Sequence, residues 1–240
     1  MDYREKLYST YVSTHTAHLY GEATLEGIRR QFPVWKSYYG RFLPKDKAAE
    51  ILDTGCGNGG FLWWLQQIGY KNSSGIDISQ EQIQIARGLG IKNVECADLI
   101  GFLGSKQGYY DVIFVMDVIE HFNKNEILGI LKLTFDSLNS GGEVIIQTPN
   151  GESLFSGRLG YGDFTHEVIF TKSSLNQILQ ATGFKDTEFY PMEPVPKGLK
   201  SAVRYLLWKG IETILKFYMA IETGSFSGIF TQNIIAVAKK

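Results

Sequence analysis

The stretch AEILDTGCGNGGFLWWLQQIG, residues 49–69, decides the fold of this chain. A short apolar run leads directly into a glycine-rich turn, and the turn leads into a segment of large apolar residues that suits a helix. Gly55, Gly57 and Gly60 allow the backbone to turn tightly and to approach a ligand closely, with the N-terminus of the following helix above it. The stretch therefore predicts a strand, a ligand-binding turn and a helix.

The same alternation continues along the chain. Short runs rich in Val, Ile and Leu predict strands buried on both faces, and the segments between them are typical of helices. The predicted strands after the first are residues 73–78, 93–98, 110–117, 143–148, 186–193 and 231–240. Further helices are expected at 171–182 and 198–222, and residues 1–45 have a mostly helical, aromatic-rich pattern. Strands that alternate with helices predict an α/β protein with a doubly wound, Rossmann-like sheet and helices on both faces.

Composition excludes several classes of protein. The 240 residues carry 24 Lys and Arg against 25 Asp and Glu, a net charge of −1, so nothing in the charge favours binding to nucleic acid. Only two cysteines occur, which excludes a disulfide framework and a cysteine-rich zinc site. Neither a signal sequence nor an apolar run of about 18 residues is visible, and we expect a soluble, cytoplasmic protein.

We expect one domain that spans residues 1–240, because a chain of this length can bury roughly 70–75% of its unfolded surface around a single core. Its expected parts are a helical N-terminal lid (1–45), a cofactor-binding core (46–190), a helical insertion (191–229) and the last strand (230–240).

Three acids stand at the ends of three consecutive predicted strands. Asp53 precedes the glycines, where a pyrophosphate would meet negative charge and a cationic ligand group would be welcome. Asp77 is placed to accept hydrogen bonds from a ribose diol, and Asp98 to face an adenine edge. Together they predict a site for a neutral or cationic nucleoside, although each acid could instead be a helix cap, Asp98 above all. The spacing of the glycines also satisfies GxGxxG, which leaves a nicotinamide dinucleotide open.

The segments ILDTGCGNGGFL, GIDIS, CADL, YDVIFVMDVIEHF and LNSGGEVIIQTPNG resemble the successive motifs of class I S-adenosylmethionine-dependent methyltransferases. The resemblance covers about residues 48–190 and implies a seven-stranded sheet whose last strand is antiparallel. It also implies S-adenosyl-L-methionine as the cofactor, with glycines by its methionine part, Asp77 at its ribose and Asp98 by its adenine. The complete cofactor set that we expect is Asp53, Gly55, Gly57, Asp77, Ile78, Asp98, Leu99 and Met116.

Histidines follow the fourth and fifth predicted strands at the same sheet edge. Methyl transfer from a sulfonium is an in-line displacement, and a hydroxyl acceptor must also lose its proton, for which an imidazole is suited. His121 and His166 are the candidate bases, and the alternative for each is a histidine that only makes local hydrogen bonds. His15 and His18, in the N-terminal segment, are expected on the surface or in packing.

The stretch DVIEH, residues 117–121, and a later T-H-x-x-x-F-T are similar to ubiquinone-type O-methyltransferases within the same family. That resemblance implies a divalent metal held by Asp117, Glu120 and His121. The alternative, which we favour, is that Glu120 and His121 fix the loop without a metal. The ubiquinone-type enzymes carry an arginine before the first motif, and no residue of this chain aligns with it securely.

The segment 198–222 has apolar residues at helical spacing and a basic face. We expect a helix that packs on the core or acts as a lid; the alternative is a face for a membrane surface or a phosphorylated carrier. The basic residues are Lys197, Lys200, Arg204, Lys209 and Lys216.

This C-terminal region is similar to methyltransferases associated with bacterial surface-polysaccharide synthesis. The resemblance implies methyl transfer to a hydroxyl of a small molecule, a sugar or a lipid- or nucleotide-linked glycan. An O-methyltransferase acting on a phenol or quinone precursor is an alternative. Two other classes stay open, an NAD-dependent oxidoreductase and a non-catalytic binding protein with the methyltransferase fold, and the oligomeric state is not predicted.

Overall fold

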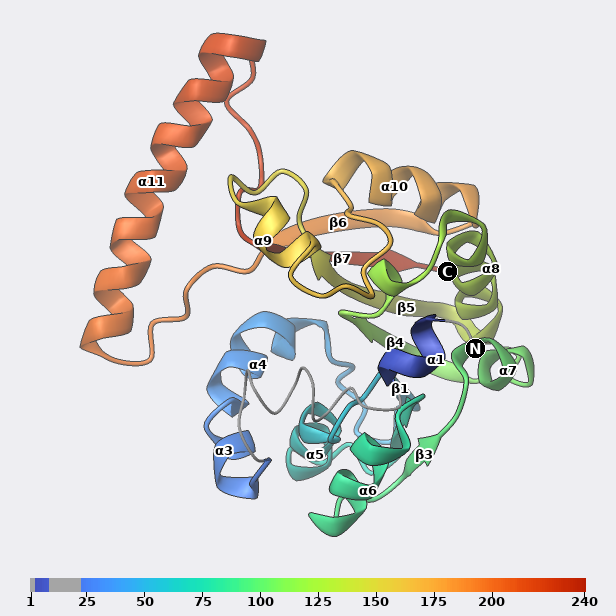
Figure 1. Ribbon diagram of the computed structural model, residues 1–240. Helices are drawn as coiled ribbons and strands as arrows, with labels where there is room; N and C mark the ends of the chain where they lie inside the picture. Colours follow the sequence, from blue (N-terminus) through green and yellow to red (C-terminus); the bar gives the residue numbers. More distant parts are fainter. Residues whose placement is uncertain (1–2, 9–22) are drawn as a thin grey trace.

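The computed structural model describes residues 3–8 and 23–240, and within these ranges it contains one seven-stranded sheet. The strand order is β3-β2-β1-β4-β5-β7-β6, and the final strand in the sequence runs antiparallel to both of its neighbours (Figure 1). The strands are β1 (Ile51–Thr54), β2 (Ser73–Asp77), β3 (Val94–Cys96), β4 (Tyr110–Met116), β5 (Leu138–Pro149), β6 (Lys185–Pro191) and β7 (Asn233–Lys239). The predicted Rossmann-like sheet and its antiparallel last strand are confirmed.

Helices cover both faces of the sheet (Figure 1). They include α5 (Gly60–Gln67), α6 (Gln80–Gly88), α7 (Leu99–Gly104), α8 (Lys124–Ser137), α9 (Ser156–Gly160) and α10 (Lys172–Ala181). The central strands are buried on both faces because one apolar cluster lies under α7, α8 and α10, and others lie under α5, α6 and an N-terminal helix, α4 (Phe32–Tyr39). This explains why their sequences read as continuous apolar runs.

Local capping fixes where several of these helices begin. Asn123 accepts hydrogen bonds from the backbone of Asn125 and Glu126, which starts α8, and Ser79 and Thr171 start α6 and α10 in the same way. The α8 helix ends at Ser137, and β5 begins at the next residue, so this strand starts earlier than the predicted run 143–148.

The described part of the N-terminal segment is helical, as expected. It comprises α1 (Tyr3–Tyr8), α3 (Leu25–Arg29), α4 (Phe32–Tyr39) and the short η2 (Gly40–Phe42). His15 and His18 lie outside the described residues.

The C-terminal helix α11 (Leu199–Thr223) corrects one expectation. It does not pack its apolar face on the core: it stands apart from the sheet and is joined to it at both ends by extended segments (Figure 1). Periodicity predicts that a helix has an apolar face, but it does not say which surface covers that face.

Candidate active site

The turn after β1 requires glycine at three positions, the last of which is Gly59, with a φ angle of +74° directly before α5. Gly55 and Gly57 have φ angles of +66° and +52°, which side chains rarely adopt. A Cβ atom at Gly55 would also lie 2.4 Å from Cγ2 of Val118, in the loop after β4. The turn is therefore packed tightly against the end of β4, and it exposes backbone where a ligand can approach.

Asp53 is buried beside this turn, with only 1% of its surface exposed. Neither of its carboxyl oxygens has a hydrogen-bond partner among the described residues. Burial, and then the charge of Asp77, raise the pKa of Asp53 well above its ordinary value. Since buried polar groups are normally paired, this carboxyl is a strong indication that a bound ligand supplies the missing donors.

Asp77, at the end of β2, is held by two backbone donors. The amides of Gly57 and Ser79 each donate to one of its oxygens at 2.8 Å. Burial raises the pKa of Asp77 and those two hydrogen bonds oppose the rise. The next residue, Ile78, is 53% exposed, so an apolar side chain lies open at the same strand end.

The rest of the predicted cofactor set is placed less directly. Asp98 accepts a hydrogen bond from the amide of Gly101 at 2.8 Å and begins α7, so its alternative role as a helix cap is confirmed. The side chain of Leu99 packs in the core, which leaves only its backbone for a ligand. Met116, the last residue of β4, is half-buried at the same sheet edge as Asp77.

A polar chain links β4 to the N-terminal helices. Asp117 has a φ angle of +52°, and its Oδ2 accepts a hydrogen bond from Nε2 of the side-chain amide of Gln147 in β5. The hydroxyl of Tyr39 donates to Oε1 of the same side-chain amide. Although Asp117 is exposed as a residue, protein atoms crowd its carboxyl and raise its pKa to about 6, while the Gln147 donor opposes the rise.

Glu120 is fully buried behind Asp117. Its Oε2 accepts a hydrogen bond from the hydroxyl of Thr148 at 3.1 Å, and its Oε1 has no hydrogen-bond partner among the described residues. Burial and the neighbouring charge of Asp117 raise the pKa of Glu120 well above its ordinary value. The backbone carbonyl of Glu120 accepts from the amides of Glu167 and Val168, which brings the loop after β5 to this edge.

His121, which follows Glu120 after β4, meets His166 from the loop after β5. Their rings lie 4.6 Å apart, centroid to centroid, in an edge-on arrangement. The Nδ1 atom of His121 is 2.8 Å from the hydroxyl of Thr165, and that hydroxyl donates to Asp163 at 2.7 Å. Burial, and then His166, lower the pKa of His121 to about 4, so its imidazole is neutral at neutral pH.

Helix α1 lies against the same loop. Arg4 forms an ion pair with Glu126 at 2.9 Å and a longer one with Glu167 at 3.5 Å. The ring of Tyr8 is 6.3 Å from that of His121, and burial raises the pKa of Tyr8 to about 12. Helix α1 thus lies beside the histidine pair and the loop after β5.

Three potential metal ligands gather at this point, but they are not the predicted three. Glu120, His121 and His166 offer ligand atoms that all lie within 4.8 Å of one another. Asp117 is not part of this group, because the positive φ angle places its carboxyl against Gln147 instead. The sequence motif counts neighbours along the chain, whereas His166 comes from the loop after β5.

Sequence reasoning missed Tyr39, Gln147, Thr165 and Tyr8. Each acts through a hydrogen bond or ring contact with a residue distant in the chain. Thr165 had a usable signal, because it stands directly before His166 in the T-H-x-x-x-F-T segment.

A family model described as a methyltransferase domain matches residues 28–188 of this chain. The chain belongs to that methyltransferase family. The resemblance to class I S-adenosylmethionine-dependent methyltransferases is thereby confirmed, and the nicotinamide-dependent alternative is not supported.

Solved structures agree with the fold of this methyltransferase. A SAM-dependent methyltransferase from Archaeoglobus fulgidus has a TM-score of 0.65 at 25% identity and covers 90% of this chain and 97% of its own. A phosphoethanolamine N-methyltransferase 2 from Haemonchus contortus, in complex with S-adenosyl-L-methionine, has a TM-score of 0.63 at 18% identity over 97% of this chain and 60% of its own. The latter shows likeness of fold alone.

One curated relative is a plant protein, a probable (S)-tetrahydroprotoberberine N-methyltransferase 2 from Papaver bracteatum. It is 39% identical over 92 residues, which are 35% of this chain and 25% of the plant protein. The methyltransferase therefore matches only a quarter of that relative's length.

The residues of this methyltransferase fit S-adenosylmethionine. The buried carboxyl of Asp53 lacks donors that a cationic group could supply, and Asp77 is fixed at the end of the next strand. The left-handed backbone at Gly55 leaves no room for a side chain between the turn and Val118. Among the described residues, no helix is both long enough and apolar enough to cross a bilayer.

The shifted pKa values predict a specific pH dependence of stability. In the folded chain His121 has a pKa of about 4, below its ordinary 6.5. Its contribution to the free energy of unfolding is fully present above pH 6.5, and it is lost as the pH falls towards 4, because only the unfolded chain binds a proton at this residue in that range. The pKa of Asp117 is raised from 3.8 to about 6, so this group stabilises the folded chain as the pH falls over nearly the same range. Relative to the wild type, His121→Gln should gain up to about 3 kcal/mol in free energy of unfolding between pH 7 and pH 4.

Urea unfolding at a series of pH values, in EDTA, measures this difference. Asp117→Asn is the matched control, and its free energy relative to the wild type should change in the opposite direction as the pH falls. If the free energies of unfolding of His121→Gln and the wild type change in parallel with pH, the pKa of His121 is not lowered by burial.

Proposed function

We propose that this methyltransferase transfers a methyl group from S-adenosylmethionine to a hydroxyl of a small molecule, a sugar or a glycan. The observation that carries the proposal is the neutral, half-buried imidazole of His121 just after β4, next to the strand ends that carry the cofactor set. A hydroxyl acceptor must lose a proton during transfer, and a neutral imidazole can take it.

The cofactor residues have distinct roles in this proposal. Asp53 accepts hydrogen bonds from a cationic group of the cofactor, and Asp77 accepts them from its ribose hydroxyls. Ile78 and Met116 supply apolar contacts to its base. The cofactor itself supplies a methyl group on a sulfonium, which is electrophilic and leaves a neutral thioether after transfer.

The hydrogen bonds at His121 set which nitrogen acts as the base. The hydroxyl of Thr165 gives its own proton to Asp163, so it accepts the Nδ1–H of His121. The tautomer that results carries its lone pair on Nε2. The acceptor hydroxyl loses its proton to this Nε2 as its oxygen forms the bond to the methyl carbon. Thr165 and Asp163 are therefore positioning residues.

Amine acceptors form a second candidate class. Two of the proteins similar to this chain are named as N-methyltransferases. The carboxylate of Asp117, which is exposed near the histidines, would attract a cationic amine before transfer.

An acceptor screen tests the proposal. The purified protein is incubated with S-adenosylmethionine labelled in its methyl group and with three acceptor panels: sugars and nucleotide-linked sugars, phenols, and amines including phosphoethanolamine. Label in the sugar panel, lost in His121→Ala, supports the proposal. Label confined to phenols or amines overturns the acceptor class. Binding of S-adenosylhomocysteine without turnover of any acceptor would favour the non-catalytic alternative.

A divalent metal at this site gives a further prediction. Glu120, His121 and His166 would hold such an ion, which would lower the pKa of an acceptor hydroxyl. In our proposal, however, burial raises the pKa of Glu120 and so disfavours the charged carboxylate that a metal prefers, and His121 must keep its Nε2 free. We therefore expect EDTA to leave turnover unchanged and added Zn²⁺ to inhibit it by occupying the two imidazoles.

Initial rates in EDTA, and after stepwise addition of Zn²⁺ or Mg²⁺, measure this. His166→Gln should be less sensitive to Zn²⁺ than the wild type, and Asp117→Asn should be equally sensitive. Loss of activity in EDTA that Mg²⁺ restores would show a metal-dependent enzyme instead.

A further inference from the structure

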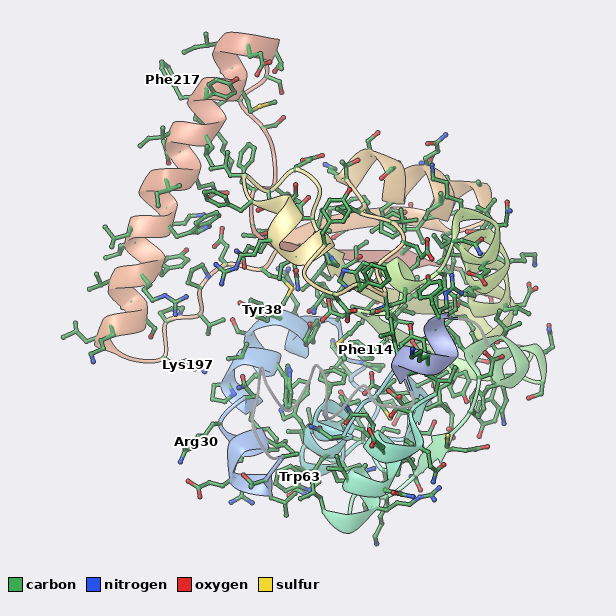
Figure 2. All side chains as sticks on the ribbon, viewed as in Figure 1. Arg30, Tyr38, Trp63, Phe114, Lys197 and Phe217 are labelled. Atoms are coloured by element: carbon green, nitrogen blue, oxygen red, sulfur yellow. The ribbon has the colours of Figure 1, made fainter. Side chains whose placement is uncertain are left out.

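The outward face of helix α11 is apolar and lies open. Six of its large residues are between 62% and 84% exposed, and on an ideal helix they fall within about 100° of one another. They are Leu199, Leu206, Leu207, Ile214, Phe217 and Ile221. No element of the described chain covers this face, and Figure 2 shows α11 at the edge of the molecule, with Lys197 near its beginning and Phe217 near its other end.

The polar contacts of α11 face the protein instead. Glu212 is the one buried residue that the helix contains, and it forms ion pairs with Lys209 at 2.6 Å and Lys216 at 2.9 Å. Lys209 also pairs with Glu193, in the segment that leads from β6 to the helix. A helix that served the core would bury its apolar face, whereas α11 exposes that face and turns the ion pairs of Glu212 towards the protein.

The charges at the beginning of α11 select an anionic partner. No acidic residue lies between Lys197 and Arg204, and Glu193, four positions before Lys197, pairs with Lys209 instead. Within the described chain none of Lys197, Lys200 and Arg204 forms an ion pair. In helical projection Lys200 borders the apolar face. This local excess of positive charge contrasts with the net charge of −1 of the whole chain.

We propose that α11 docks this protein on the surface of an anionic lipid bilayer. The helix lies in the plane of the interface, with its apolar face among the acyl chains and Lys197, Lys200 and Arg204 at the anionic headgroups. A helix of 25 residues is about 37 Å long, and its charged residues keep it from crossing the bilayer. A second copy of the chain fits less well, because Glu222 alone, at the far end of the helix, would face three cations.

Vesicle flotation tests this inference, which does not depend on the acceptor proposed above. We expect the full chain to float with vesicles of phosphatidylcholine and phosphatidylglycerol at 3:1, and not with phosphatidylcholine alone. Leu206→Glu/Phe217→Glu should lower the vesicle partition coefficient at least tenfold, as should Lys200→Gln/Arg204→Gln. The matched controls, Leu128→Glu on α8 and Lys71→Gln/Lys92→Gln, should bind as the wild type does.

The variants are compared only where their melting temperature and binding of S-adenosylhomocysteine equal those of the wild type, which separates docking from folding and from the cofactor site. Absence of binding to the anionic vesicles overturns the proposal. Light scattering decides what replaces it: a dimer that Leu206→Glu/Phe217→Glu dissociates would assign the face to a contact between two copies.

Discussion

His121→Ala is expected to lower kcat at least about 10²-fold while leaving the affinity for S-adenosylhomocysteine nearly unchanged. The imidazole is the proposed proton acceptor, and removing it leaves only water to take the proton of the acceptor hydroxyl. No hydrogen bond in the described structure links His121 to the residues of the glycine turn, so the cofactor site should survive the change. Steady-state rates on the acceptor found by the screen, with calorimetric binding of S-adenosylhomocysteine, measure both quantities.

The pH profile separates a base from a merely structural residue. With a pKa of about 4, His121 stays neutral from about pH 5 upwards, so the wild-type rate should not fall with the titration of an ordinary histidine near 6.5. Thr165→Val removes the group that fixes the tautomer, and it should lower kcat by about tenfold without changing cofactor affinity. Turnover equal to that of the wild type in His121→Ala would remove this residue from the base role.

The central strands were predictable because each is a short apolar run buried from both sides. Asp53, Asp77 and Asp98 could be placed at strand ends for the same reason, since the ends follow from the runs. Ser79 starts α6 as its local pattern predicts. These features depend on residues within a few positions of one another.

Contacts between distant residues were not predictable. Tyr39 and Gln147 are 108 positions apart, and the amide of Gln147 decides where the carboxyl of Asp117 lies. His166 joins Glu120 and His121 only because the backbone carbonyl of Glu120 holds the loop after β5. The open face of α11 is a third case, since a periodic pattern contains no information on what covers it.

Asp77→Asn is expected to weaken binding of S-adenosylhomocysteine by about 10²- to 10³-fold. The carboxylate is the proposed acceptor for two ribose hydroxyls, and each hydrogen bond to a charged group contributes about 1.5–3 kcal/mol. The change keeps the size of the side chain but removes the charge and one acceptor oxygen.

Asp98→Asn is the matched control for Asp77→Asn. It removes the same charge from the end of the next strand, and asparagine still caps α7, so affinity should fall by about tenfold or less. Isothermal titration calorimetry on both variants compares them directly. Equal losses would mean that the two acids contribute alike and that Asp77 has no special position at the ribose.

The stability of the free protein shows whether Asp77 binds the cofactor or only holds the turn. The amides of Gly57 and Ser79 would share one acceptor oxygen in Asp77→Asn, which costs about 1–3 kcal/mol, whereas removing a buried charge offsets part of that cost. A purely structural role predicts a large fall in melting temperature and, once the protein is folded, normal affinity. A binding role predicts a small fall in melting temperature and a stabilisation by S-adenosylhomocysteine that largely disappears, and the hydrogen-bond geometry around Asp77 favours this second result.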